Sequence, residues 1–287
     1  TPTAVVDRKD RIVVYLAGRP RTQESWNADV ADASRAMTEA AVGLRKELTK
    51  ADLAHRRGKF ACLRAGITHG GGGTAPSNMG NRIASQNAAA AALCARPSFQ
   101  RIAGFASSAF ALGAPRLFEH YREAVDGVCG YNPKLTRPFA SSVFPAATFN
   151  LGPQAATVKH RDHANVPYGW CAITALGSFD PKAGGHLYLW ELKLVFEFPS
   201  GSTILIPSSI ISHGNTPVQK GETRQSFTQY CAGGIMRWNA YGFRTEATLK
   251  AEDPELFARR MAEAPGRWEK ALGYFSKLSE LKKDHGV

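Results

Sequence analysis

The spacing of hydrophobic positions along the chain changes near residue 139. Before that residue, apolar side chains recur every three or four positions in several segments, a period that predicts helices packed through one face. The predicted helices cover residues 25–49, 83–96, 98–112 and 115–128. Residues 4–17 alternate around a turn at Asp7 to Asp10 instead, which predicts two short strands.

After residue 139, short runs of β-branched and aromatic residues are separated by Gly and Pro. The predicted strands cover residues 142–149, 155–160, 170–176, 186–190, 194–198, 203–206 and 223–231. Many short strands with turn signals at this spacing predict a barrel or jelly roll. From Asp253 to about Lys283 the period predicts an amphipathic helix pair, broken at Pro265 and Gly266.

The chain has 287 residues, a length that fits one large domain or two small ones. The order of the segments leads us to expect one composite α+β unit. In it, residues 1–138 supply mostly helical support and a nucleic-acid-facing region, 139–245 form the β core, and 246–287 form a helical cap. Because the chain begins with Thr1 rather than Met, we expect that it has been trimmed.

The net charge of +12 favours acidic partners, nucleic acid before an anionic membrane. Residues 35–64 hold eight Lys or Arg against three Asp or Glu, whereas residues 251–287 hold seven of each kind. The cations Arg56, Arg57 and Lys59 are candidate phosphate contacts, although a solvated helix face explains the same run equally well. The sequence has no run of about 18 apolar residues and no visible signal peptide, so no membrane segment is expected.

Four consecutive glycines, Gly70–Gly73, interrupt the chain before Arg82. The entropy lost on ordering them excludes a helix interior. No Gly-Lys-Ser/Thr follows, which excludes a phosphate-binding P-loop. The segment is either a flexible linker or a loop that approaches a nucleic-acid backbone, with Arg82 as a candidate contact.

The five cysteines are widely spaced, and none forms a Cys-x-x-Cys pair. This spacing argues against a disulfide framework and against a zinc module. We expect buried free thiols in a reducing compartment.

Three polar residues in the strand-rich part have the spacing of a metal site. His160 and Asp162 are two positions apart, so on a strand both side chains point to one face. His213 follows 51 residues after Asp162. Two histidines and one carboxylate on one face of Fe(II) leave positions open for a bidentate 2-oxo acid and O2. The alternative is a set of hydrogen-bonded polar residues in a structural or sugar-binding jelly roll.

A candidate co-substrate site follows on the last predicted strand. Arg224 lies 11 residues after His213, and Ser226 shares its strand face. The guanidinium fork of Arg224 matches the distal carboxylate of 2-oxoglutarate, and Ser226 can donate a further hydrogen bond. Asn150, ten residues before His160, is a further candidate contact. The combined pattern predicts Fe(II) and 2-oxoglutarate as cofactors.

Five other residues receive a structural interpretation. His163 and His186 are expected to support the site rather than bind metal. Trp170 and Trp190 lie in apolar strand patterns and are expected in the core. Asp180, in a Phe-Asp-Pro turn, is expected to cap that turn, with substrate contact as the alternative.

Two segments, residues 160–165 (HRDHAN) and 224–230 (RQSFTQY), resemble the TET/JBP group of nucleic-acid-modifying dioxygenases. Residues 169–208 and 228–238 resemble the expanded fungal branch of this group, which is associated with transposons. The resemblance covers most of the chain, more weakly before Arg101. It implies a double-stranded β-helix fold and stepwise oxidation of the 5-methyl group of 5-methylcytosine in DNA.

The resemblance also implies a role for each matching residue. The implied iron ligands and 2-oxoglutarate contacts are His160, Asp162, His213, Arg224 and Ser226. Asn165 would hydrogen-bond the target base, and Tyr230 would stack on it. Because a methyl group inside a duplex cannot reach such an iron site, the nucleotide must be flipped out of the helix.

One position departs from the animal TET enzymes. Ala232 stands where they carry a His that reads cytosine, and their Cys-rich zinc region is absent here. A smaller residue leaves room for a larger base, such as N6-methyladenine. The choice between the two methylated bases therefore stays open.

We expect an Fe(II)- and 2-oxoglutarate-dependent DNA dioxygenase that oxidises 5-methylcytosine to 5-hydroxymethylcytosine and further products. Its expected partner is double-stranded methylated DNA, without membrane or zinc, and its expected state is a monomer. A nuclear location follows from the substrate alone. Two alternatives remain: a protein or small-molecule hydroxylase with the same iron chemistry, and an inactive DNA-binding protein of a mobile element.

Overall fold

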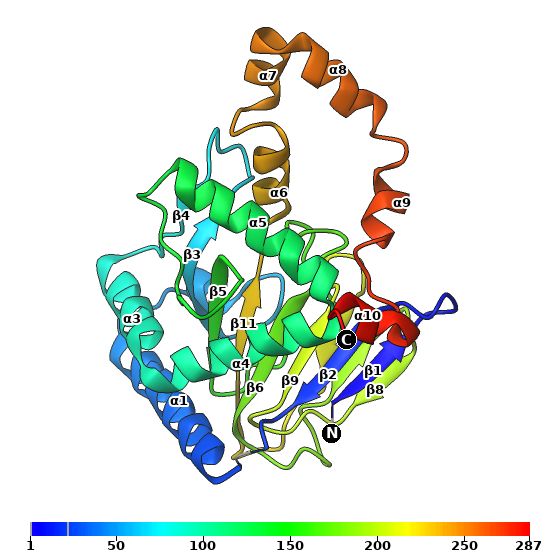
Figure 1. Cartoon of the computed structure of the whole chain (residues 1–287). Helices are drawn as coiled ribbons and strands as arrows, with labels where there is room; N and C mark the ends of the chain where they lie inside the picture. Colours follow the sequence, from blue (N-terminus) through cyan, green and yellow to red (C-terminus); the bar gives the residue numbers. More distant parts are fainter. Residues whose placement is uncertain (1, 22) are drawn as a thin grey trace.

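Two antiparallel sheets form the centre of the computed structural model, which describes residues 2–21 and 23–287 (Figure 1). The expectation about Thr1 therefore lies outside the described residues. The large sheet has the order β1-β2-β9-β6-β11-β5-β3-β4 and the small sheet the order β10-β7-β8. The large sheet consists of β1 (Thr3–Val6), β2 (Ile12–Gly18), β3 (Ala61–Thr68), β4 (Ser77–Asn78), β5 (Ala146–Gly152), β6 (Cys171–Ser178), β9 (Thr203–Ile206) and β11 (Thr223–Tyr230). The small sheet consists of β7 (Leu187–Leu189), β8 (Leu194–Phe196) and β10 (His213–Asn215).

The two sheets are joined by one cluster of buried apolar side chains. It includes Val14, Cys171, Ile173, Ala175 and Ile204 from the large sheet, and Leu187, Leu189, Phe198 and Ile211 from the small sheet and its loops. Successive side chains of a strand point to opposite faces, so the other face of the large sheet is left for helices. This arrangement confirms the predicted α+β fold with a jelly-roll core, a double-stranded β-helix.

Helices from the first half of the chain cover that other face (Figure 1). They are α1 (Gln23–Leu44), α2 (Lys50–Leu53), α3 (Ala84–Ala95), α4 (Pro97–Gly113) and α5 (Pro115–Tyr131). Phe99 of α4 meets Phe149 of β5 and Phe227 of β11, at ring-centroid distances of 4.9 and 5.3 Å. All three rings are buried, and each such burial stabilises the fold by about 1.5–3 kcal/mol.

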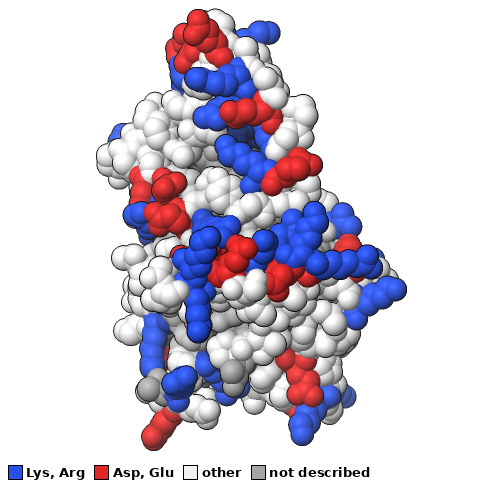
Figure 2. All heavy atoms as spheres, turned by 45° about the vertical axis from the view of Figure 1, so that its right-hand side comes forward, with Lys and Arg blue, Asp and Glu red and all other residues white. Residues whose placement is uncertain are grey.

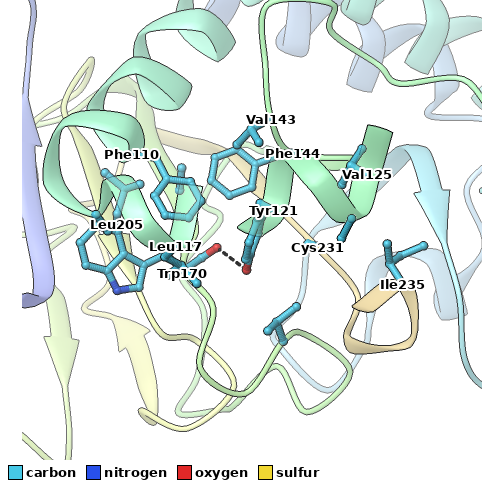
Figure 3. Close-up of a cluster of buried hydrophobic side chains, with 14 of the residues drawn as sticks. Phe110, Leu117, Tyr121, Val125, Val143, Phe144, Trp170, Leu205, Cys231 and Ile235 are labelled. Carbon is cyan, nitrogen blue, oxygen red and sulfur yellow. Dashed lines mark hydrogen bonds between the residues drawn. The ribbon is translucent and has the colours of Figure 1, made fainter. Parts of the chain in front are cut away.

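A second helical core surrounds Trp170, just before β6 (Figure 3). Its ring lies 5.6 Å from that of Phe110 on α4 and 6.4 Å from that of Tyr15 on β2. The hydroxyl of Tyr121 on α5 donates a hydrogen bond of 3.2 Å to the carbonyl of Trp170. The predicted burial of Trp170 is confirmed, and this core anchors the segment that follows His160–Asn165.

The C-terminal helices form an arch that rises from the β core and returns to it (Figure 1). They are α6 (Gly233–Ala240), α7 (Glu246–Glu252), α8 (Pro254–Ala262), α9 (Arg267–Leu272), the 3-10 turn η1 (Leu278–Glu280) and α10 (Leu281–Asp284). The second residue of α6 is Gly234, where a Cβ would lie 2.2 Å from the carbonyl oxygen of His69. The chain just after β3 therefore packs directly on the first turn of α6.

Several predicted helices and strands have different bounds in the structure. The helix expected to reach Thr49 ends at Leu44, and Thr49 caps α2 by accepting a hydrogen bond from the backbone nitrogen of Asp52. The strand expected from residue 142 begins at Ala146, after Pro145, which has no N–H for a ladder. The C-terminal break at Pro265 and Gly266 is confirmed, but the helix after it ends at Leu272 rather than near Lys283.

The strand predicted over residues 155–160 is wrong. The backbone nitrogen of Val158 donates to the carbonyl of Arg57 outside any ladder, and His160 pairs with His213 only as an isolated bridge. Strands β3 and β10 and helix α6 were not predicted. Strand β3 supplies part of the wall of the site described below.

Two composition-based expectations can be compared with the structure. All five cysteines are free thiols, of which Cys171 and Cys231 are buried and the other three partly exposed. Among the described residues, no helix has the length and apolar character needed to cross a membrane.

Candidate active site

His160, Asp162 and His213 come together where the connection from β5 to β6 meets β10. His160 and His213 exchange two backbone hydrogen bonds of 3.0 and 2.9 Å, which hold the two residues opposite each other. The Nε2 atom of each ring lies 3.8 Å from a different carboxylate oxygen of Asp162. One candidate ligand atom from each residue lies within 4.8 Å of the other two. The structure thus groups the three predicted ligands.

Both imidazole rings present the same nitrogen to the centre of this group. Nδ1 of His160 lies 2.8 Å from the carbonyl oxygen of Val158, and Nδ1 of His213 lies 2.9 Å from that of Ile211. A carbonyl can only accept, so each Nδ1 carries the proton and each Nε2 keeps its lone pair. Two imidazoles in backbone-fixed tautomers and one carboxylate fit a divalent transition metal.

The electrostatic surroundings favour neutral imidazoles at His160 and His213. Burial lowers the pKa of His160 and of His213, and repulsion between the two rings lowers the pKa of His160 further. Neutral imidazole is the form that binds metals. The guanidinium of Arg56 donates to Asp162 Oδ1 at 3.3 Å and to the carbonyl of Arg161 at 2.7 Å, which orients the carboxylate.

Three residues, Glu191, Arg161 and Ser212, connect the two segments that carry the ligands. Arg161 lies between two ligands, and Ser212 directly precedes the third. The Glu191 carboxylate accepts hydrogen bonds from Ser212 N (2.6 Å), Ser212 Oγ (2.7 Å) and Arg161 Nη2 (2.7 Å), and Arg161 Nε donates to Ser212 Oγ at 3.0 Å. Burial opposes the charge on Glu191, but hydrogen bonds from Ser212 and Arg161 hold its pKa at about 2. We call this network the Glu191 clamp.

The inner face of β11 carries a row of polar side chains. Its members are Arg224, Ser226, Thr228 and Tyr230. Their spacing of two residues places them on one strand face, whereas Phe227 packs against the helices. Strand β5 completes the row: Asn150 Nδ2 donates to Ser226 Oγ at 2.8 Å, and the hydroxyls of Thr148 and Tyr230 are 3.2 Å apart.

Arg224 is fully buried without an acidic partner among the described residues. Its Nη1 donates to the carbonyl of Ala155 at 2.6 Å, while Nε and Nη2 are buried and form no hydrogen bond. Burial lowers the pKa of Arg224 to about 10. An unpaired buried guanidinium is costly, so these two N–H groups indicate the place of an anionic ligand. Oδ1 of Asn150 is also buried and unpaired.

A cavity of about 490 Å³ opens beside the candidate metal site. Asp162 forms part of its wall, and the remainder comes from β3, β4, β5, β11 and nearby loops. Arg56, Arg57 and Arg64 line it, with Asp162 as the one carboxylate among the described lining residues. The excess of positive charge favours an anionic substrate. Lys59, predicted together with Arg56 and Arg57, is not among these lining residues.

The two residues that the resemblance assigned to the target base, Asn165 and Tyr230, also line this cavity, and so does Ala232. The Asn165 side chain donates to Ser208 Oγ at 3.0 Å, and its Oδ1 accepts no hydrogen bond from the described residues. Asn165 and Ala232 form an isolated backbone bridge, which fixes their spacing. The structure gives their positions, and their roles stay predictions.

Arg82 and Asp180 lie outside the set of residues that line this cavity. Arg82 forms an ion pair of 2.9 Å with Asp52 and donates to the carbonyl of Glu47 at 2.6 Å. Asp180 accepts a hydrogen bond of 2.9 Å from the backbone nitrogen of Lys182, which caps the turn as expected. Their substrate contacts stay predictions.

Three further residues and one loop singled out in the sequence lie outside the metal group. His163 is exposed, and His186 Nδ1 lies 3.1 Å from Thr216 Oγ1; neither belongs to the metal group. The prediction that Trp190 lies in the core is wrong, because its side chain is 60% exposed just beyond the end of β7. Gly70–Gly73 form an exposed turn between β3 and β4, and neither interpretation of it is tested.

Sequence reasoning missed several residues of the site. Thr148 and Thr228 could have been found by extending the period of two from Asn150 and Ser226. Glu191 carries no signal in the sequence, because the clamp depends on residues that meet only in the folded chain.

Comparisons with known proteins show the fold. The sequence matches no protein-family model and no curated protein. In three dimensions the chain is similar to NgTET1 in complex with 5mC DNA, with 11% sequence identity, coverage of 82% of this chain and 78% of that chain, and a TM-score of 0.56. A prolyl-4-hydroxylase from Pseudomonas putida aligns at 13% identity over 69% of this chain and 86% of that one, with a TM-score of 0.31. The NgTET1 likeness shows that the fold is shared, and membership of the fungal, transposon-associated branch stays a prediction.

Proposed function

We propose that this protein is an Fe(II)- and 2-oxoglutarate-dependent dioxygenase that oxidises a methylated base in double-stranded DNA. The observation that carries the proposal is the group His160, Asp162 and His213, in which the backbone fixes both imidazole tautomers and Asp162 lies in the wall of a cationic cavity. The fold that the chain shares with NgTET1, whose structure contains 5mC DNA, supports the same reaction class.

The three grouped residues would hold Fe(II), and Arg224 would bind the distal carboxylate of 2-oxoglutarate. The two unpaired N–H groups of Arg224 match the two oxygens of a carboxylate. Ser226 and Asn150, already hydrogen-bonded to each other, add polar contacts on the same row. Once bound, the cofactors supply C–H hydroxylation, in which O2 and 2-oxoglutarate are consumed and succinate and CO2 are formed beside the hydroxylated product.

The substrate would be a base flipped out of the duplex into the cavity of about 490 Å³. Tyr230 supplies a face for stacking, and Oδ1 of Asn165 supplies a hydrogen-bond acceptor for the base edge. We place 5-methylcytosine first and N6-methyladenine second, since Ala232 leaves space beside Asn165. The arginines at the cavity would contact phosphates. A monomeric state and a nuclear location belong to the same proposal.

The decisive experiment compares the products from two duplexes, one with 5-methylcytosine and one with N6-methyladenine, after incubation with Fe(II) and 2-oxoglutarate. Mass spectrometry should detect oxidised base and one succinate for each oxidation step. The Asp162→Ala variant should give neither product while still binding DNA. If the wild-type protein binds iron but oxidises neither base, the proposal fails in favour of a protein or small-molecule hydroxylase. If the wild-type protein binds DNA but no iron, both enzyme hypotheses fail and the inactive DNA-binding protein is supported instead.

A further inference from the structure

A second cavity, of about 300 Å³, lies among α6, α8 and α9 at the base of the C-terminal arch. The adjacent residues Ala232 and Gly233 line one cavity each: Ala232 lines the active-site cavity and Gly233 lines this one. The two cavities therefore share the backbone at the start of α6 as a common wall. We call the second cavity the α6–α9 pocket.

Four cations from three helices line the α6–α9 pocket. They are Arg237 of α6, Arg260 of α8, and Arg267 and Lys270 of α9. One carboxylate is present among the described lining residues, that of Glu263, and it pairs with Arg260 at 3.1 Å. Over the outside of the arch, basic and acidic side chains are interleaved (Figure 2). The described residues that line the pocket therefore carry an excess of positive charge.

The four cations differ in what they already bind. Arg260 Nε donates to the carbonyl of Ala240 at 3.1 Å, and Arg267 Nη2 donates to the carbonyl of Arg260 at 2.7 Å. These two guanidinium groups are held in place by the fold. Arg237 and Lys270 are exposed and make no side-chain hydrogen bond or ion pair with the described residues. Two cations thus remain available to an anionic ligand beside two that are fixed.

A stack of rings makes one side of the pocket firm. Tyr168 and Tyr274 line it, with ring centroids 5.7 Å apart and planes 19° apart. His120 stacks on Tyr274 at 4.2 Å, and its Nε2 lies 3.0 Å from the hydroxyl of Tyr168. The cations therefore face a preformed cavity rather than a flexible surface.

We propose that the α6–α9 pocket binds the phosphate backbone of the DNA strand whose base enters the active-site cavity. Arg237 lies five residues beyond Ala232, which corresponds to roughly 7 Å along α6. This distance equals the rise of about two base-pair steps along the DNA helix axis. A strand that places a base beside Ala232 can therefore bring a nearby phosphate to Arg237 and Lys270. This inference rests on the proposed function and assigns a surface to its substrate.

The test is the salt dependence of DNA binding by the full chain, loaded with Fe(II) and 2-oxoglutarate, without O2. The variant Arg237→Ala/Lys270→Ala should bind a methylated duplex roughly tenfold more weakly. Its salt slope should fall by about two, because two cations no longer neutralise phosphates. The matched control Lys282→Ala/Lys283→Ala removes two exposed cations of α10 that do not line the pocket. Inorganic phosphate alone serves as the probe for a free-anion site.

Each outcome has a distinct meaning. A lower slope in the pocket variant, with a control like the wild type, supports the inference. Unchanged affinity and slope in the pocket variant overturn it and leave the proposed function intact, even if the wild type binds inorganic phosphate. Equal losses of DNA affinity in both variants also overturn it, because the loss would then not depend on where the removed cations lie. Failure of the wild type to bind DNA overturns the inference and the proposed substrate together. Thermal unfolding and iron binding of both variants exclude misfolding.

Discussion

Glu191 accepts hydrogen bonds from both the backbone nitrogen and the hydroxyl of Ser212, at 2.6 and 2.7 Å. Ser212 directly precedes His213, so the position of one metal ligand depends on a carboxylate 21 residues before Ser212. The same carboxylate holds Arg161, which lies between the other two ligands. The Glu191 clamp thus couples both ligand-bearing segments while making no contact with the imidazole nitrogens that face the metal position.

The substitution Glu191→Gln should weaken Fe(II) binding about tenfold. Loss of a direct hydrogen-bond partner of metal ligands typically reduces affinity by about 10–100-fold. Glu191 bonds to the neighbours of the ligands, Ser212 and Arg161, and glutamine keeps one acceptor, so the lower end of this range is expected. An anaerobic metal titration measures the effect. Glu197→Gln is the matched control, since Glu197 is exposed and outside the clamp. Equal affinities for the three proteins would show that the clamp does not support the ligands.

The clamp should also be visible in the pH dependence of stability. Against burial, hydrogen bonds from Ser212 and Arg161 hold the pKa of Glu191 at about 2 in the folded chain, below its ordinary value of 4.5. The stability that Glu191 contributes is therefore fully present above pH 4.5 and is lost as the pH falls through about 2. In urea unfolding of metal-free protein, the difference between wild type and Glu191→Gln should be constant at neutral pH and shrink in this window. If the difference in unfolding free energy between wild type and Glu191→Gln is as large at pH 2 as at neutral pH, the charge on Glu191 does not stabilise the fold.

Replacement of Arg224 by Met should weaken 2-oxoglutarate binding without destabilising the fold. The variant loses the two unpaired N–H groups that would hold a carboxylate, so 2-oxoglutarate affinity should fall by roughly a hundredfold, the value of a strong bidentate pair. The melting temperature without 2-oxoglutarate should stay equal or rise, because a buried charge without an acidic partner is removed. The Arg224→Lys variant should also bind 2-oxoglutarate weakly, since lysine lacks the planar guanidinium group that pairs with both carboxylate oxygens. Calorimetric titration measures the affinities, and unfolding of Arg224→Met would instead indicate a structural role.

Some of this site follows from strand periodicity alone. Arg224, Ser226 and Tyr230 fall on one face because side chains alternate along β11. The antiparallel register then places Asn150 directly opposite Ser226, which makes their hydrogen bond a consequence of pairing. Strand periodicity also predicts the jelly roll, because a short alternating strand can bury its apolar face only against another sheet or a layer of helices.

Other parts could not be predicted because they depend on contacts between distant segments. His160 and Asp162 share a site although they lie on no strand: His160 is held by His213, and the backbone nitrogen of Asp162 donates to the carbonyl of Ser208. The exposure of Trp190 likewise has no signal in its apolar neighbours. It follows from the end of β7, where Lys159 covers one face of the ring at 3.7 Å from its centroid.

Ala232 lies where it can influence the choice between the two methylated bases. Ala232 is 3% exposed, lines the active-site cavity and has an extended backbone that a β-branched residue can adopt. Ala232→Val should therefore keep the backbone conformation and narrow the cavity beside Asn165, at a cost of about 1–3 kcal/mol in stability because Ala232 also packs in the core. One or two added methyl groups discriminate between substrates by about 1–3 kcal/mol, so the ratio of N6-methyladenine to 5-methylcytosine turnover should fall at least tenfold. Single-turnover assays on both duplexes measure this ratio. Ala251→Val, at an exposed position of α7, is the matched control and should leave the ratio unchanged. If Ala232→Val slows both bases equally while iron and 2-oxoglutarate still bind, Ala232 does not select the base.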